Sequence, residues 1–146
     1  MALLLDTNVI TELCKRRNLK VRDRFRMALA RGETILLSAV ALYEVRRGLY
    51  ELIRRGNAQK DGTEQLRLLD ELMISRGVKE ISWSVWDRAA TLWAELRGRG
   101  ATPGPLEKLD GDSLLSAHAE SLSATVATRN PKHFREIGIP IEDWGD

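Results

Sequence analysis

Residues 1–8 of this 146-residue chain read MALLLDTN, an apolar run that ends in an acid and two small polar residues. Short apolar runs of this kind are typical of strands that are buried on both faces of a parallel sheet. We therefore expect Asp6 at the carboxyl end of a first buried strand. Ligands bind at this edge of open parallel sheets, so Asp6 is a candidate site residue by its position alone.

Short apolar runs alternate with amphipathic segments of helix length along the rest of the chain. The pattern predicts strands near 2–5, 35–38, 78–82, 125–128 and 139–142, and helices near 8–16, 20–31, 40–55, 62–76, 84–98 and 112–122. This alternation favours a parallel sheet covered by helices. Glycines and prolines in 98–105 predict a loop that leads toward Asp110 and Asp112.

Length and composition predict a single domain over residues 1–146, since 43% apolar content supplies one core. The start does not resemble a signal peptide, and no segment approaches the roughly 20 apolar residues of a membrane span. We expect a cytoplasmic protein. Cys14 is the only cysteine, which excludes an internal disulfide and predicts an inert packing role.

The formal net charge is only +2, but the basic residues are clustered, for example in 15–17, 46–47 and 54–55. Solvated helix faces explain such clusters in many proteins. A rim that contacts phosphate groups would have the same composition. The sequence leaves both interpretations open.

Glu44 lies beside an apolar stripe of the predicted helix 40–55, which contains Ala41, Val45, Gly48, Leu49 and Leu52. This placement predicts a partly buried carboxylate, which needs a cation or hydrogen-bond donors. A salt bridge to a nearby arginine and a metal site both satisfy that need.

Asp112 opens the segment DSLLSAHA at 112–119, where Leu114, Leu115, His118 and Leu122 share one helical arc. An acid at a helix start is commonly an N-terminal cap. However, Asp6, Glu44 and Asp112 are all predicted near strand ends or early in helices, so a parallel sheet would bring them to one edge. Three carboxylates form an oxygen-rich site that suits Mg²⁺ or Mn²⁺ better than zinc.

Four segments together carry a resemblance to a known family. They are LLDTN at 4–8, LSAVALYE at 37–44 followed by Gly48, DSLLSA at 112–117 and TRNPKHF at 128–134. In order and spacing these segments resemble the PIN-domain nucleases, and the VapC-type toxins in particular. Each motif is weak alone, whereas the ordered set spans essentially the whole chain.

The resemblance implies a three-layer α/β/α sandwich with a central, mainly parallel sheet of about five strands. It also implies a Mg²⁺-dependent endoribonuclease in which Asp6, Glu44 and Asp112 match the family's acidic, metal-binding positions. Thr7 and Asn8 match small polar residues that support the first acid. Divalent ions held by carboxylates supply what phosphodiester cleavage needs, so no histidine base is required.

Asn130 stands where the family often has a fourth acid. An asparagine oxygen can coordinate a cation but adds no charge, which leaves a second metal ion in doubt. Arg46, Arg47, Arg129 and His133 are candidate RNA contacts, and a plain surface histidine is the alternative for His133.

The resemblance further implies an RNA substrate, a cognate VapB-like antitoxin protein and a homodimer. A housekeeping RNA-processing nuclease and a non-catalytic binding module are the alternatives within the family. A phosphatase of the haloacid-dehalogenase type would need an acid where the chain has Asn8. A receiver domain would need a pair of acids after the first strand.

Two further features have core interpretations. His118 falls inside an apolar arc, which predicts a hydrogen-bonded core or interface histidine. The run Trp83, Trp86, Ala90, Trp93 and Arg97 has helical spacing. This spacing favours core or subunit packing over a base-stacking surface.

Overall fold

The computed structural model describes residues 1–56, 59–100 and 106–145. Its elements in chain order are β1 (Ala2–Leu5), α1 (Thr7–Lys15), α2 (Leu19–Ala30), β2 (Thr34–Leu36), α3 (Ala39–Arg55), α4 (Gln59–Arg76), α5 (Trp83–Gly98), α6 (Leu106–Ser121), β3 (Thr125–Thr128), α7 (Pro131–Ile137) and β4 (Ile141–Asp143). The predicted class is confirmed, because a parallel sheet lies between helical layers.

The sheet has the order β2-β1-β3-β4, and all its pairs are parallel. The described residues thus form four strands, and the prediction of a strand near 78–82 is wrong. In its place a single bridge joins Lys79 to Ser38, with the Lys79 amide donating to the Leu37 carbonyl at 2.8 Å. Because β2 ends at Leu36 and α3 begins at Ala39, the chain offers no longer run of partners.

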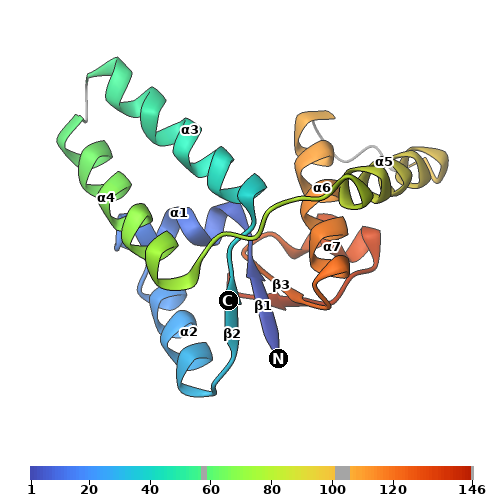
Figure 1. The fold of residues 1–146 in the computed structure, drawn as a ribbon, viewed down its shortest axis with the longest axis horizontal. Helices are drawn as coiled ribbons and strands as arrows, with labels where there is room; N and C mark the ends of the chain where they lie inside the picture. The colour runs from blue at the N-terminus through green and yellow to red at the C-terminus, as the bar shows by residue number, and fades with distance from the viewer. Residues whose placement is uncertain (57–58, 101–105, 146) are drawn as a thin grey trace.

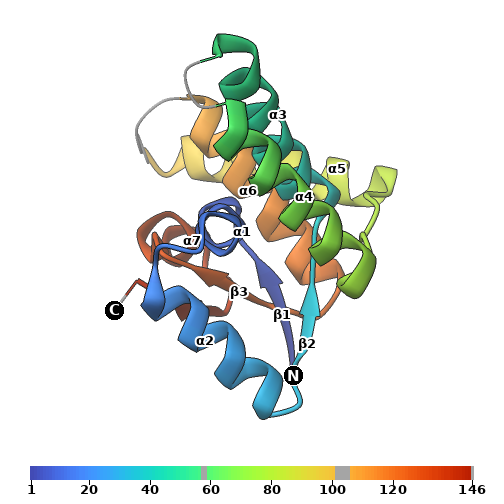
Figure 2. The ribbon, with the colours of Figure 1, turned by 90° about the vertical axis from the view of Figure 1, so that its left-hand side faces the viewer.

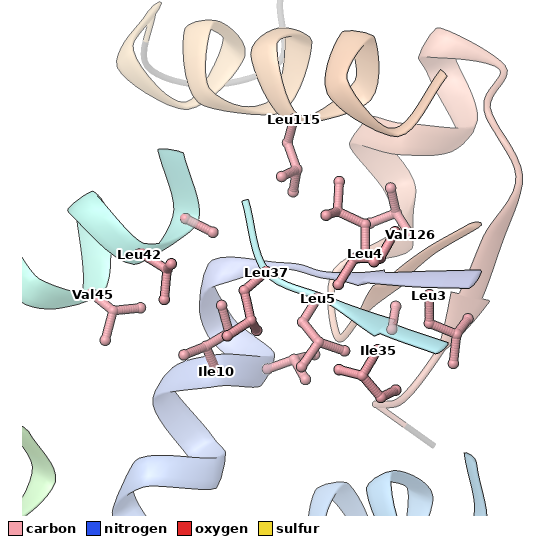
Figure 3. Packing of buried hydrophobic residues seen from close by; sticks show 14 of the residues in the cluster. Leu3, Leu4, Leu5, Ile10, Ile35, Leu37, Leu42, Val45, Leu115 and Val126 are labelled. Carbon is pink, nitrogen blue, oxygen red and sulfur yellow. The ribbon is translucent and has the colours of Figure 1, made fainter. Parts of the chain in front are cut away.

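Residues of the central strands alternate between two apolar layers. Figure 3 shows Leu4 and Val126 pointing toward Leu115 of α6, whereas Leu3, Leu5 and Ile35 point to the opposite side, where Ile10 of α1 lies. The partner register agrees, since Leu4 pairs with Val126 and Leu3 with Ile35. The run 3–5 is fully buried because helices cover both faces.

Two helical boundaries differ from the sequence prediction. Helix α6 begins at Leu106, six residues before Asp112, so Asp112 lies inside the helix and the cap interpretation is wrong. Helix α7 was not predicted. It begins with Pro131 in its first turn and ends at Gly138 in the left-handed conformation with φ of 90°, which are the usual start and stop signals. Of the predicted loop 98–105, residues 101–105 lie outside the described residues.

The helices after the first two strands form two groups. Figure 1 shows α3 and α4 side by side and α5 and α6 as a separate pair, and Figure 2 confirms that both groups lie toward the carboxyl ends of β1 and β2. The strand ends and the first turns of α3 therefore face the region between the two groups.

Within the described ranges, no helix is long and apolar enough to span a membrane.

Candidate active site

Asp6 lies where β1 ends and is the N-cap of α1. Its Oδ1 accepts a hydrogen bond from the Thr7 amide at 2.8 Å, and its Oδ2 accepts one from the Thr128 hydroxyl at 2.7 Å. Thr128 is the last residue of β3, which neighbours β1 in the sheet. Two donors thus hold the carboxylate of a residue that is only 7% exposed.

Glu44 lies in the second turn of α3 and is half-buried. The Thr7 hydroxyl donates to its Oε2 at 3.3 Å, which links Glu44 to the start of α1. On its other side lies Gly111 of α6, where a Cβ atom would be 3.2 Å from Glu44 Oε1. The absence of a side chain at 111 therefore leaves the room that the Glu44 carboxylate occupies.

Asp112 of α6 faces the segment that follows β3. Its Oδ2 is 2.8 Å from Nδ1 of His133, which lies in α7. The His133 side chain is only 15% exposed, so the alternative of a plain surface histidine is wrong. The ring fixes the orientation of the Asp112 carboxylate from one side.

One cavity of about 220 Å³ joins these groups. Its lining includes the three acids Asp6, Glu44 and Asp112, the polar residues Thr7, Asn8 and Asn130, the cation Arg47, and Ala41, Gly111, Leu115 and Phe134. The structure thus brings the predicted acids together from three elements far apart in sequence. It does so at the carboxyl ends of the parallel strands.

The three carboxylates have raised pKa values. Burial is the main cause for each. It raises the pKa of Asp112 to about 6. The nearby charge of Asp6 adds to this increase, and the hydrogen bond with His133 opposes it. Burial also raises the pKa of Asp6, against the hydrogen bonds from Thr128 and Thr7. For Glu44, burial and the charge of Asp6 raise the pKa, whereas Thr7 and Arg47 lower it. Clustered acids of this kind are stabilised by a bound cation.

The residues around the cavity fit a divalent cation in their chemistry. Hard ions such as Mg²⁺ take carboxylate, carbonyl and water oxygens, and carboxylates line this cavity. Because residue 111 has no side chain, the Glu44 carboxylate has room beside α6 to reach the cavity. Among the residues that the structure describes, no three acidic, histidine or cysteine side chains lie close enough together to hold a metal ion.

The four predicted RNA contacts have different surroundings. Arg47 lines the cavity, and His133 contacts Asp112. Arg46 pairs with Asp70 of α4, and Arg129 pairs with Glu12 of α1 at 3.2 Å. Neither Arg46 nor Arg129 is among the residues that line the cavity.

Thr128 and Gly111 are site residues that the sequence reasoning did not assign. The hydroxyl of Thr128 donates to Asp6 and also accepts from the Asn130 amide at 2.9 Å. Thr128 is a polar residue at the end of the predicted strand 125–128, as Asp6 is a polar residue at the end of the first strand, so Thr128 could have been found. Gly111 offers no such signal, because its role depends on how closely α6 approaches Glu44.

The remaining core predictions have mixed outcomes. His118 is buried and its Nδ1 lies 2.8 Å from the Ser38 hydroxyl, which confirms a hydrogen-bonded core histidine. Cys14 is buried and its pKa is raised by burial to about 11, in line with an inert thiol. The prediction of core packing is wrong for Trp83 and Trp86, which are 78% and 49% exposed.

Comparison with known proteins gives a family and a set of similar folds. The family model described as PIN domain matches residues 3–140. FitAcB from Neisseria gonorrhoeae has 24% identity and a TM-score of 0.77 over 98% of this chain and 98% of that chain. DNA-bound VapBC from Salmonella typhimurium has 25% identity and a TM-score of 0.75 over 99% of this chain and 98% of that chain.

A third similar structure is VapBC-1 from nontypeable Haemophilus influenzae, with 23% identity and a TM-score of 0.74 over 100% of both chains. No curated protein matches this sequence. The PIN-domain resemblance that the four sequence segments carry is confirmed by the family match.

Proposed function

Because this chain belongs to the PIN domain family, we propose that it is a Mg²⁺-dependent endoribonuclease that acts as the toxin of a toxin-antitoxin pair and inhibits translation. One observation carries the catalytic part: Asp6, Glu44 and Asp112 come from three different elements and line a single cavity together with Arg47. Carboxylates in this number at a strand edge suit the cleavage of a phosphodiester bond.

Asp6, Glu44 and Asp112 would hold the cation, and Mn²⁺ could replace Mg²⁺ there. When bound, such an ion neutralises charge on the phosphate and activates water. The other residues fix this arrangement. Thr7 and Thr128 orient Asp6, Thr7 also holds Glu44, and His133 orients Asp112. Arg47 places a positive charge at the same cavity, where the phosphate of the substrate would lie.

Asn130 supports the site from the edge of the cavity without adding charge. Its backbone N–H donates to the Thr128 hydroxyl, which in turn donates to Asp6. We infer that the site holds one ion tightly, because the three carboxylates carry the only negative charges that line the described cavity. A second ion would then enter with the RNA phosphate.

A cognate antitoxin protein and a second copy of this chain are the proposed partners. The support is that several solved structures with this fold are VapBC and FitAB assemblies, some of them on DNA. The likeness covers nearly the whole length of each similar chain, as expected for proteins of the same small size. The protein would then act in the cytoplasm.

Cleavage by purified protein tests the catalytic proposal. Wild type and Asp6→Asn are incubated with a defined single-stranded RNA in Mg²⁺ and in excess chelator. We expect cleavage by wild type in Mg²⁺ alone, and none by Asp6→Asn, whose amide oxygen can still accept from the Thr7 amide and keep the α1 cap. Cleavage in chelator, or at wild-type rate by folded Asp6→Asn, would overturn the proposal.

Growth of a bacterial host tests the toxin role separately. Expression of wild type should arrest translation, and Asp112→Ala should relieve the arrest. A wild-type protein that cleaves RNA in vitro but is harmless at high soluble expression would instead indicate a housekeeping nuclease. A protein that binds RNA without cleaving it would indicate a non-catalytic module.

A further inference from the structure

A second cavity of about 630 Å³ adjoins the acidic one and shares Glu44, Arg47 and Gly111 with it. Its remaining lining is mostly apolar or aromatic and consists of Ala39, Val40, Tyr43, Glu80, Ile81, Trp86 and Leu114. Tyr43 comes from α3 and Trp86 from α5, so the cavity lies between the two helical groups of Figure 1. A ligand that reaches the carboxylates can therefore extend directly into this aromatic space.

Arg47 connects the two cavities. Its guanidinium lies over the Tyr43 ring, 5.3 Å from the ring centroid, and it lines both spaces. No acidic side chain among the described residues forms an ion pair with it at 4 Å or less. Arg46, one residue earlier, is by contrast occupied by Asp70. Arg47 interacts electrostatically with Glu44, whose pKa it lowers, and it places a positive charge at the boundary between the acids and the rings, where a phosphate group can approach it.

The aromatic rings beside the site are accessible to solvent. Tyr43 is 62% exposed and Trp86 is 49% exposed. Proteins bind single strands of nucleic acid by combining cations that follow the backbone with aromatic rings on which unpaired bases stack. Tyr43, Trp86 and Arg47 supply both parts of that combination next to carboxylates that suit phosphodiester cleavage.

A third cavity of about 470 Å³ continues past Trp86 and is also lined by Trp93 and Ser113. The Ser113 hydroxyl and the Trp93 Nε1 group are buried without a hydrogen-bond partner within the described parts of the chain. Both atoms are closed to solvent, so a ligand in the cavity does not reach them without movement of the side chains.

We propose that the space between Tyr43 and Trp86 is a subsite for an unpaired nucleobase of the RNA, adjacent to the cleaved phosphate, with Arg47 on the phosphate. The proposal rests on the ribonuclease function proposed above. A base inside a duplex is stacked and paired, and it cannot enter this space without leaving the helix. A bound protein segment is the competing occupant that the experiment distinguishes.

The chain offers a matched control for the aromatic residues. Tyr50 lies on the same helix, is 52% exposed, and has the Arg46 guanidinium 5.9 Å from its ring centroid. It lines a different cavity, which also includes Tyr43 and Arg47 but neither Trp86 nor any of the three acids. Tyr43→Ala and Tyr50→Ala therefore remove the same kind of arginine-stacked ring, one that lines the proposed site and one that does not.

The test measures binding of fluorescein-labelled decauridylate to proteins that also carry Asp6→Asn, so that no cleavage occurs. Stacking on one ring predicts a loss of affinity of about fivefold or more for Tyr43→Ala and for Trp86→Ala. Tyr43→Phe, Trp86→Phe and Tyr50→Ala should bind as the parent does. A self-complementary duplex of equal length should bind more weakly than the single strand, and its affinity should not depend on Tyr43. In the cleaving protein, the same alanine variants should raise KM.

Three results would overturn the subsite. The first is equal affinity of Tyr43→Ala, Trp86→Ala and Tyr50→Ala for decauridylate. The second is an equal loss of affinity for the duplex. The third is unchanged RNA affinity together with weaker homodimer or antitoxin association, which would make this face a protein interface. Each leaves Mg²⁺-dependent cleavage intact, whereas absence of cleavage by wild type overturns the underlying function instead.

Discussion

Nδ1 of His118 lies 2.8 Å from the hydroxyl of Ser38, and this hydrogen bond joins the helix that carries Asp112 to the start of the helix that carries Glu44. Ser38 is the N-cap of α3, where its oxygen accepts from the Val40 amide at 3.2 Å. His118 also makes a hydrogen bond to the backbone of Glu80, and burial lowers its pKa. A neutral, buried imidazole thus fixes the spacing between two of the three carboxylates.

Ser38→Ala should therefore destabilise the protein and slow cleavage. Loss of the cap and an unpaired Nδ1 on the buried imidazole together cost about 2 kcal/mol. Chemical denaturation measures that cost, and single-turnover cleavage measures the effect on Glu44 and Asp112. The control is Asn18→Ala, which removes the cap of α2 away from the site. If both variants cleave equally well under conditions where both are folded, the bond has no positioning role.

Gly111→Ala should reduce metal affinity and cleavage without reducing stability. The new Cβ would lie 3.2 Å from Glu44 Oε1, so the carboxylate must move. Alanine in a helix is about 1 kcal/mol more favourable than glycine, so the loss of activity cannot come from unfolding. Gly48→Ala is the matched control, because a Cβ there meets nothing within 4 Å. Calorimetric titration with Mn²⁺ tests both variants, and wild-type affinity in Gly111→Ala would contradict the prediction.

The affinity for Mn²⁺ should rise with pH and level off above about 6, the pKa of Asp112. Below that pH the cation competes with a proton on the carboxyl, and above it the carboxylate is free. Isothermal titration between about pH 5 and pH 8 measures the change. An affinity that is constant over this range would show that Asp112 does not bind the ion.

The same raised pKa has a consequence for the metal-free protein. The folded state holds the Asp112 proton more tightly than the unfolded chain, so this group's contribution to stability is greatest below pH 3.8 and is lost as the pH rises toward about 6. Asp112→Asn should consequently raise the melting temperature in chelator at neutral pH, with little change at pH 4. A lower melting temperature at neutral pH would argue against repulsion among the carboxylates.

Asn130→Asp should strengthen Mn²⁺ binding by about threefold to tenfold, which corresponds to about 1 kcal/mol for one added, exposed charge. Asn130 lines the cavity, and the substitution changes its charge with almost no change in shape. Asn130→Ala serves as the control and should show no gain. Two tight sites in wild type, or equal affinity in the aspartate variant, would mean that charge at this position does not limit occupancy.

Local sequence was sufficient for several features of the fold and the site. The run 3–5 is buried on both sides, and Asp6 follows it at the sheet edge as expected. The position of Glu44 beside an apolar stripe predicted its partial burial. These features depend on hydrophobic periodicity over a few residues, which can be recognised in the sequence without knowledge of the fold.

Other features required the tertiary structure because they depend on residues distant in sequence. The run 78–82 has strand-like residues but forms only one bridge, since β2 offers no further partners. Three side-chain hydrogen bonds form because β3 and α6 return beside the first strand. They join Thr128 to Asp6, His133 to Asp112, and Ser38 to His118. The exposure of Trp86 beside Tyr43 also follows from how α5 packs against α6. Sequence by itself determined which residues carry charge and which are apolar, whereas the packing of distant elements decided which carboxylate each hydroxyl, ring and glycine contacts.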